Sequence, residues 1–265
     1  MQLPLYQVDA FTDHALGGNP AAVMPLDAWL SDELLQAIAG ENNLSETAYI
    51  VANGPAYDLR WFTPTVEVDL CGHATLATAH VLFEHLDYPD PQIRFLTRSG
   101  ELRVTRDGSG YRMDFPTPVL VEAAVSAELE AALGAPVLDA ALPANNPSMM
   151  VCRLESEDTV AGLAPDFRAL LAATPYSVIA TAQGSDRDMV SRFFGPQVGV
   201  DEDPVTGSAH CCLTAYWAPR LQRERLTARQ ISARVGELVC ELSGERVYLS
   251  GNAVTYLTGV VHRVD

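Results

Sequence analysis

Two stretches of the chain are apolar on nearly every face at helical spacing, and each follows a short glycine-bearing segment. The first helix-like stretch starts after Gly72 and runs to about Glu84, and the second starts after Gly207 and runs to about Trp217. Their apolar positions are Ala74, Leu76, Ala77, Ala79, Val81 and Leu82, and then Ala209, Cys211, Cys212, Leu213, Ala215 and Trp217. A helix that is apolar all round is buried, so we expect each stretch to form the centre of a folded unit.

Short apolar runs separated by turn residues predict strands around these two helices. A further helix is expected after Ser31, which is a suitable N-cap residue, and another near residues 167–172. The predicted strands cover residues 5–11, 21–24, 46–51 and 57–62, two or three segments within 93–115, and residues 149–152, 177–181, 189–194, 231–235, 237–242, 247–249 and 253–261.

The two glycines lie about half of the 265-residue chain apart, and the elements around them follow approximately the same order. Such an internal repeat is typical of a duplicated structural unit. It predicts an α+β protein with two pseudo-symmetric lobes, each a mostly antiparallel sheet wrapped round a central helix. We place the N-terminal lobe at residues 1–120 and the C-terminal lobe at residues 121–265. An ordinary α+β protein with coincidentally similar halves is the alternative.

Both glycine segments have the composition of an anion site at a helix start. Small residues before a helix leave several backbone N–H groups without a partner, and the positive end of the helix dipole lies behind them. Such helix starts bind carboxylates. Two of them predict a cleft between the lobes that holds a small carboxylic acid from both sides.

Composition excludes several classes of protein. The net charge is −17, and all 17 basic residues are arginine. The acidic balance argues against nucleic acid as a partner. The lack of lysine excludes pyridoxal phosphate enzymes, Schiff-base aldolases and Walker-type phosphate loops, which all depend on a lysine amine.

Cofactors, metals and membranes are not expected either. The five cysteines form no C-x-x-C pair, and the six histidines show no zinc-ligand spacing. The chemistry is therefore expected to come from side chains alone. No apolar run approaches the roughly 20 residues that cross a bilayer, and the first residues lack the pattern of a signal peptide. We expect a cytoplasmic protein.

Glu46 and Asp203 are the acid/base candidates. Glu46 follows Ser45 at the mouth of an apolar strand, where partial removal from water suits a group that takes and returns a proton. A solvated carboxylate at a strand end is the alternative. Asp203 lies just ahead of the second central helix and could act as a second acid/base or orient one. Alternatively, it accepts hydrogen bonds only from its own turn.

Three residues beside the two glycines are further candidates. His73 and Ser208 follow Gly72 and Gly207 directly, so both could bind a substrate carboxylate or assist proton transfer. For Ser208, helix capping is the structural alternative. Cys71 precedes Gly72 at a helix start, a placement that lowers the pKa of a thiol and fits a thiolate base. We favour the alternative, that Cys71 is a buried small apolar residue.

Taken together, these motifs resemble those of the PhzF-like phenazine-biosynthesis family. Its wider superfamily includes diaminopimelate epimerase and proline racemase. The resemblance covers essentially the whole chain and implies a two-lobed, diaminopimelate epimerase-like fold without a cofactor, commonly as a homodimer. The similar segments are residues 6–11 (YQVDAF), 18–21 (GNPA), 44–47 (LSET), 71–75 (CGHAT) and 202–209 (EDPVTGSA).

The resemblance also assigns roles. It implies that Glu46 is the proton-moving acid/base and that His73, Asp203 and Ser208 bind substrate or assist the transfer. The epimerase relatives use two cysteines, one at each helix start. Cys71 occupies the first place, but residues 203–207 offer no thiol at the second. A two-thiol racemisation is therefore not expected.

These observations predict a cofactor-independent isomerase that moves a proton on a small carboxylic acid. The predicted catalytic residues are Glu46, Asp203 and His73. Ser45, Gly72, His73, Gly207 and Ser208 are predicted to bind the substrate, and no metal is expected. The alternatives are an epimerase or racemase that uses Cys71 as one base, and a small-molecule binding protein that has lost its activity.

Overall fold

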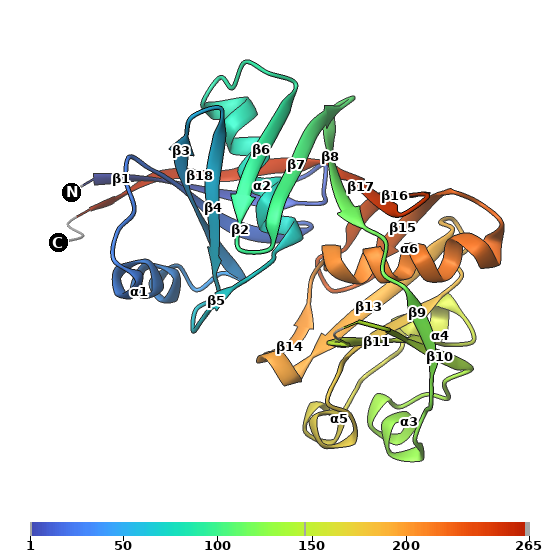
Figure 1. The fold of residues 1–265 in the computed structure, drawn as a ribbon. Coiled ribbons are helices and arrows are strands. Elements are labelled where there is room, and N and C mark those ends of the chain that lie inside the picture. The colour runs from blue at the N-terminus through green and yellow to red at the C-terminus, as the bar shows by residue number, and fades with distance from the viewer. Residues whose placement is uncertain (1, 146, 263–265) are drawn as a thin grey trace. The chain divides into compact units, whose positions relative to one another are not determined.

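The computed structural model describes residues 2–145 and 147–262, and the chain forms two units. The first unit contains residues 2–114 together with 250–262, and the second contains Phe115–Leu249. The boundaries fall inside two strands, β8 (Gly110–Pro116) and β17 (Arg246–Gly251). Figure 1 shows the elements of both units along the chain.

The sheet of the first unit has the strand order β18-β1-β2-β3-β4-β6-β7-β8. The β2–β3 and β4–β6 pairs are parallel, and the other pairs are antiparallel. A short strand, β5 (Glu67–Val68), pairs with β4, and α1 (Asp32–Asn42) connects β2 to β3. The strands are β1 (Gln2–Ala10), β2 (Asn19–Leu26), β3 (Glu46–Asn53), β4 (Ala56–Phe62), β6 (Gln92–Thr97), β7 (Gly100–Asp107) and β18 (Ala253–His262).

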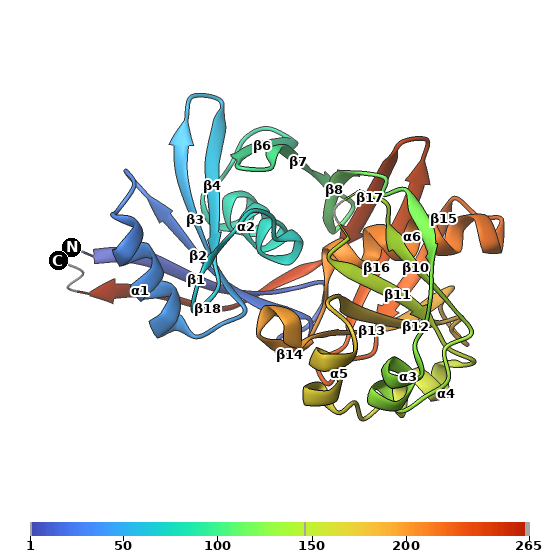
Figure 2. The same cartoon turned by 60° about the horizontal axis from the view of Figure 1, so that its bottom comes forward.

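The central helix of this unit is α2 (Gly72–His85). Every residue from His73 to Phe83 is buried, as expected for a helix that is apolar on all faces. The helix packs against β1, β2, β3 and β18, and Figure 2 shows it beside these strands. The prediction of a buried central helix is confirmed here.

The second unit repeats this plan around α6 (Gly207–Leu221), which packs against β9, β11, β15 and β16. Its sheet has the order β9-β10-β11-β12-β13-β15-β16. The strands are β9 (Leu120–Ala123), β10 (Asp139–Pro143), β11 (Met149–Arg153), β12 (Ser177–Ala182), β13 (Met189–Gly195), β14 (Val200–Asp203), β15 (Arg225–Gln230) and β16 (Gly236–Ser243). The remaining elements are α3 (Ala127–Leu133), α4 (Glu157–Ala161), α5 (Phe167–Ala173) and the single turn η1 (Pro196–Val198).

The two units share one pairing scheme. From β1 to β7 the pairs run antiparallel, parallel, antiparallel, parallel and antiparallel, and from β10 to β16 they run in the same sequence. In both units the central helix begins shortly after a short strand, β5 or β14, that pairs with the preceding long strand. The predicted α+β fold with two pseudo-symmetric lobes is confirmed.

The division of the chain differs from the expected one at the C-terminus. We expected residues 121–265 to form one lobe. Instead β18 pairs with β1 from Ala10↔Ala253 to Gln2↔His262, and this long antiparallel ladder holds residues 250–262 in the first unit. The chain first passes from the first unit to the second after Asp114, close to the expected boundary near residue 120.

Candidate active site

Glu46 is the first residue of β3 and lies at the edge of the apolar core of the first unit. Residues 47–50 are buried, Ser45 is half-buried, and the Glu46 side chain is 17% exposed. Parallel pairing places Glu46 in register with Ala21 of β2. The carboxylate is therefore partly removed from water and held by a strand that is fixed on both sides.

His73 lies next to this carboxylate. It is the second residue of α2, is buried, and its Nε2 lies 3.0 Å from Oε2 of Glu46. Neither atom has a well-aligned hydrogen-bond partner within the described residues. The structure thus brings two of the predicted site residues together. They are 27 positions apart in the sequence, Glu46 in the LSET motif on a strand and His73 in the CGHAT motif on a helix.

The opposite edge of the His73 ring faces two other side chains. Its Nδ1 lies 3.2 Å from Nδ2 of Asn19 and 3.5 Å from Sγ of Cys71. Asn19 is fully buried at the start of β2. The sequence analysis did not include Asn19 among the site residues, although the GNPA motif that contains it contributed to the family resemblance.

Burial decides the state of Cys71. It raises the pKa of the thiol to about 11, and the Glu46 carboxylate adds to the effect. The favoured interpretation of Cys71 as a buried small residue is confirmed, because full desolvation of the sulfur outweighs the helix dipole that would lower its pKa. For His73, burial opposes the charged form, but the Cys71 sulfur and the Glu46 carboxylate outweigh it and raise its pKa well above the ordinary value.

The donor atoms of Glu46, Cys71 and His73 lie within 4.8 Å of one another, which raises the question of a metal site. The imidazole, however, lies between the other two groups. Cys71 faces Nδ1 and Glu46 faces Nε2, so a single ion cannot replace both contacts through one ring nitrogen. The arrangement fits proton transfer better than metal binding.

The two central helices differ from the others at their N-termini. In the part of the chain that the structure describes, no side chain caps α2 or α6, whose N-cap residues are Cys71 and Thr206. The N-cap side chains therefore do not compete with an acceptor such as a carboxylate at these two helix starts. By contrast, α1, α3, α4 and α5 are each capped by a side-chain oxygen, from Ser31, Ser126, Ser156 and Asp166 respectively.

In the second unit, Asp203 belongs to a hydrogen-bonded turn before α6. One carboxylate oxygen accepts a 2.5 Å hydrogen bond from the Thr206 hydroxyl. The buried Gln230 holds the same turn from β15: its amide nitrogen donates to the Asp203 carbonyl at 2.6 Å, and its amide oxygen accepts from the Thr206 N–H at 2.9 Å. Asp203 thus helps to fix the turn through the Thr206 hydroxyl, as in the structural alternative of a residue that holds its own turn.

The remaining predicted residues lie at the helix starts. Gly207 is buried and Ser208 is half-buried as the first two residues of α6, while Gly72 is half-buried at the start of α2. Ser208 does not cap α6, because Thr206 holds that position. The predicted residues therefore form one group in the first unit and one in the second, and the cleft that would join the groups stays a prediction.

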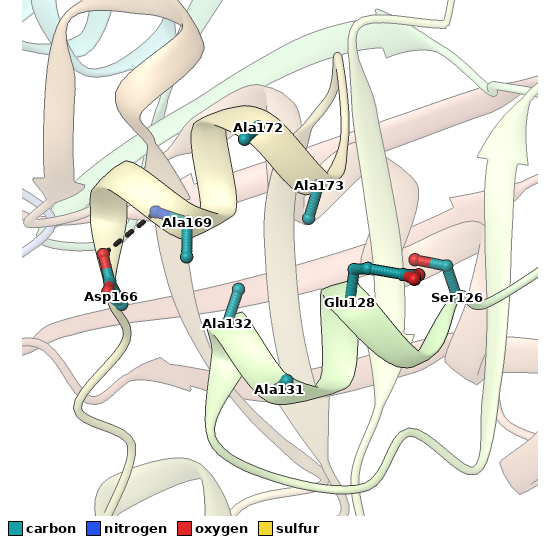
Figure 3. A pocket seen from close by; sticks show the side chains of 8 residues that line it. All are labelled: Ser126, Glu128, Ala131, Ala132, Asp166, Ala169, Ala172 and Ala173. Atoms are coloured by element: carbon teal, nitrogen blue, oxygen red, sulfur yellow. Dashed lines mark hydrogen bonds between the residues drawn. The ribbon is translucent and has the colours of Figure 1, made fainter.

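A separate pocket of about 700 Å³ lies in the second unit between α3 and α5 (Figure 3). It contains none of the predicted site residues. Two of its three polar side chains already cap these helices, Ser126 on α3 and Asp166 on α5. Alanines form most of its wall, so it lacks a set of convergent catalytic groups. The lining residues are Ser126, Glu128, Ala131, Ala132, Asp166, Ala169, Ala172 and Ala173.

None of the helices in residues 2–145 and 147–262 has the length and apolar character needed to cross a membrane.

Comparison with known proteins agrees with the fold and the motifs. The family model of the PhzC-PhzF phenazine biosynthesis-like proteins matches residues 8–259. An uncharacterized isomerase of Pseudomonas aeruginosa is 54% identical over 98% of this chain and 98% of its own length. The crystal structure of a PhzF family protein from Enterococcus faecalis has a TM-score of 0.95 and 45% identity, covering 99% of this chain and 100% of that one.

A more distant structure shares the fold alone. A hydroxyproline epimerase from Agrobacterium vitis has a TM-score of 0.60 at 10% identity, over 98% of this chain and 92% of its own. The predicted membership of an isomerase family is confirmed by the named relatives. The chain belongs to the PhzC-PhzF family of phenazine biosynthesis-like proteins.

Proposed function

We propose that the protein is a cofactor-independent isomerase that moves a proton on a small carboxylic acid, with Glu46 as the acid/base. The observation that supports this most directly is the 3.0 Å approach of the buried His73 to a carboxylate that remains partly open to solvent. A carboxylate in this setting can meet a ligand on its exposed side while the imidazole fixes its orientation.

In the proposed reaction Glu46 takes a proton from a carbon next to an activating group. The electron pair left on that carbon is delocalised into the activating group, and the protonated Glu46 then returns the proton to a different carbon. General acid–base catalysis of this kind contributes about 10²–10⁴-fold to the rate. Hydrogen-bond donors that face the developing negative charge contribute the remainder.

The uncapped helix starts are the proposed carboxylate donors. The N-cap side chains of α2 and α6, Cys71 and Thr206, make no capping hydrogen bond to the first N–H groups, at Gly72 and at Gly207 and Ser208. We assign substrate binding to these groups, with Ser45 beside Glu46 as a further polar contact. Asp203 supports the second helix start by holding Thr206. Lobe closure over the substrate would exclude water and strengthen these contacts.

Glu46→Gln tests the proposal. The change removes the carboxylate and keeps the size of the side chain, so turnover should be lost while the fold is retained. Candidate acids incubated with the protein in deuterium oxide report on the reaction, because proton transfer at carbon incorporates deuterium that NMR detects. Glu41→Gln, at an exposed position of α1, is the matched control. Exchange that persists in Glu46→Gln removes Glu46 from the mechanism.

The same experiment separates an enzyme from a binding protein. A protein that only binds an acid changes the ligand's NMR line widths but exchanges no carbon-bound hydrogen. A homodimeric state, which the family resemblance implies, and a cytoplasmic location stay predictions. Light scattering on the purified protein measures the oligomeric state directly.

A further inference from the structure

We propose that Asn19 is a positioning residue for His73. It keeps the ring proton on Nε2, the nitrogen that faces Glu46. The GNPA motif has no role in the function proposed above, and the structure places its asparagine against the His73 ring at 3.2 Å. The inference rests on the proposed role of the Glu46–His73 pair.

The position of Asn19 is tied to that of Glu46. Asn19 is the first residue of β2, and Ala21 of the same strand is in register with Glu46. Side chains two residues apart in a strand lie on the same face of the sheet, so Asn19 and Ala21 both face the side on which α2 packs. β2 thus carries Asn19 and, through its register with β3, fixes the position of Glu46. The His73 ring is held between Asn19 at Nδ1 and Glu46 at Nε2.

The loop before Asn19 holds it in place. Gly18 has a φ of +58°, and a Cβ there would lie 2.1 Å from the Ala10 carbonyl oxygen, so only glycine fits. Phe11 and Leu16 also adopt left-handed backbone conformations, with φ of 63° and 72°. Such conformations persist only where surrounding contacts enforce them, and they cluster at functional sites.

Hydrogen bonds at both ends of the loop enforce these conformations. The Asp9 carboxylate, 1% exposed, accepts a 2.8 Å hydrogen bond from the Leu16 N–H. At the other end of the loop the Phe11 N–H donates to the Asn252 carbonyl at 2.8 Å. The loop is therefore fixed from both ends, and its last residue leads directly into Asn19.

The chemistry of the contact gives Asn19 its role. An amide nitrogen of Asn19 can only donate to the His73 ring, so the Nδ1 it faces must present a lone pair. The ring proton then lies on Nε2, the nitrogen that faces the Glu46 carboxylate. The Glu46 carboxylate favours the doubly protonated ring, whereas a donor at Nδ1 favours the neutral ring with its proton on Nε2. Asn19 thus opposes Glu46 and keeps His73 able to exchange a proton.

The test is NMR of ¹⁵N-labelled histidine side chains across a pH titration, with the His73 signals assigned by their loss in His73→Gln. In Asn19→Ala the donor is gone, so the pKa of His73 should rise relative to the unmodified protein. In Asn19→Asp a carboxylate faces the ring, and the rise should be larger, about one pH unit or more. Asn19→Asp keeps the side-chain size, so it remains informative if Asn19→Ala does not fold.

Asn42→Ala is the matched control, because Asn42 donates to the Thr47 hydroxyl beside Glu46 but has no contact with the ring. It should leave the His73 titration unchanged. An unaltered titration in both Asn19 variants, or a fall in Asn19→Ala, would overturn the inference. The readout needs no turnover, so it stands apart from the deuterium-exchange test of Glu46.

Discussion

Thr206 donates its hydroxyl hydrogen to the carboxylate of Asp203 and so does not cap α6, although it occupies the N-cap position. Serine and threonine at an N-cap usually accept a hydrogen bond from an N–H group of the first turn. Here the hydroxyl is held away from those groups, which leaves the start of α6 available to an anionic ligand.

Releasing Thr206 should therefore weaken ligand binding. In Asp203→Ala the hydroxyl is free to cap α6 and to compete with a carboxylate for the same N–H groups. A cap of this kind contributes about 1 kcal/mol, which corresponds to a roughly fivefold weaker affinity. Calorimetric titration with an acid found in the deuterium-exchange screen measures the change. The double variant Asp203→Ala/Thr206→Val should recover the affinity, and equal losses in both would show that Asp203 acts on the ligand directly.

Cys71 should be unreactive and dispensable. Burial holds the pKa of its thiol at about 11, so almost no thiolate exists at pH 7.5. Cys71→Ser should change the rate of deuterium exchange only slightly, and alkylation of Cys71, followed by mass spectrometry of its peptide, should be slow in the native protein and fast after unfolding. A large loss of exchange in Cys71→Ser would favour the epimerase alternative, in which this thiol is one of two bases.

Acid should destabilise the protein through two of its buried histidines, His210 and His80. Burial lowers the pKa of His210 to about 4, against an ordinary value of 6.5. The unfolded chain then binds a proton that the folded chain does not, so stability is complete above pH 6.5 and falls as the pH drops toward 4. The loss is roughly 3 kcal/mol for a shift of this size. His80, whose pKa burial also lowers to about 4, acts in the same direction.

Urea unfolding at pH 7.5 and at pH 4.5 measures this loss. His210→Asn can still donate to the Thr206 carbonyl, which His210 contacts through Nδ1 at 2.8 Å, but it cannot titrate. The difference in unfolding free energy between the two pH values should be smaller in this variant. His14→Asn, at an exposed histidine, should behave like the unmodified protein; the same decrease in both variants would contradict the assignment.

The loop that precedes Asn19 should tolerate no side chain at Gly18. Gly18 and Gly54 have nearly the same backbone angle, with φ of +58° and +59°, but only Gly18 lies against another part of the chain. Gly54→Ala should cost the ordinary left-handed penalty of about 1–2 kcal/mol. Gly18→Ala should cost clearly more, because its Cβ would meet the Ala10 carbonyl. Thermal unfolding of the two variants gives the comparison, and equal costs would mean that the loop can move away.

The sequence predicted the two central helices well because each is apolar on all faces. The end of α6 was harder to locate. We expected the helix to stop near Trp217, whereas it continues past Pro219 to Leu221. The short helix α3 was not predicted, although it lies just after the expected lobe boundary at residue 120. Its cap was nevertheless visible: Ser126 accepts a hydrogen bond from the Leu129 N–H three residues later.

The candidate site was predictable by residue type but not by contact. The neighbouring residues in the sequence marked both Glu46 and His73 as candidates. Their approach to 3.0 Å, however, depends on how β3 packs beside the start of α2. Asn19 was missed because an asparagine before a proline is first of all a turn residue. The inert, buried Cys71 was predicted, but the size of its pKa rise was not, since complete desolvation is a property of the assembled core and not of the helix start.

The two units share one strand-pairing scheme, but only one of them carries an acidic residue at the start of the equivalent strand. β3 begins with Glu46, whereas the equivalent strand of the second unit, β12, begins with Ser177. If the halves descend from one ancestral segment, the acidic group was either gained once or discarded once after duplication. On the proposed mechanism the fold has two similar units but only one acid/base residue, so even a symmetric substrate would react at one end only.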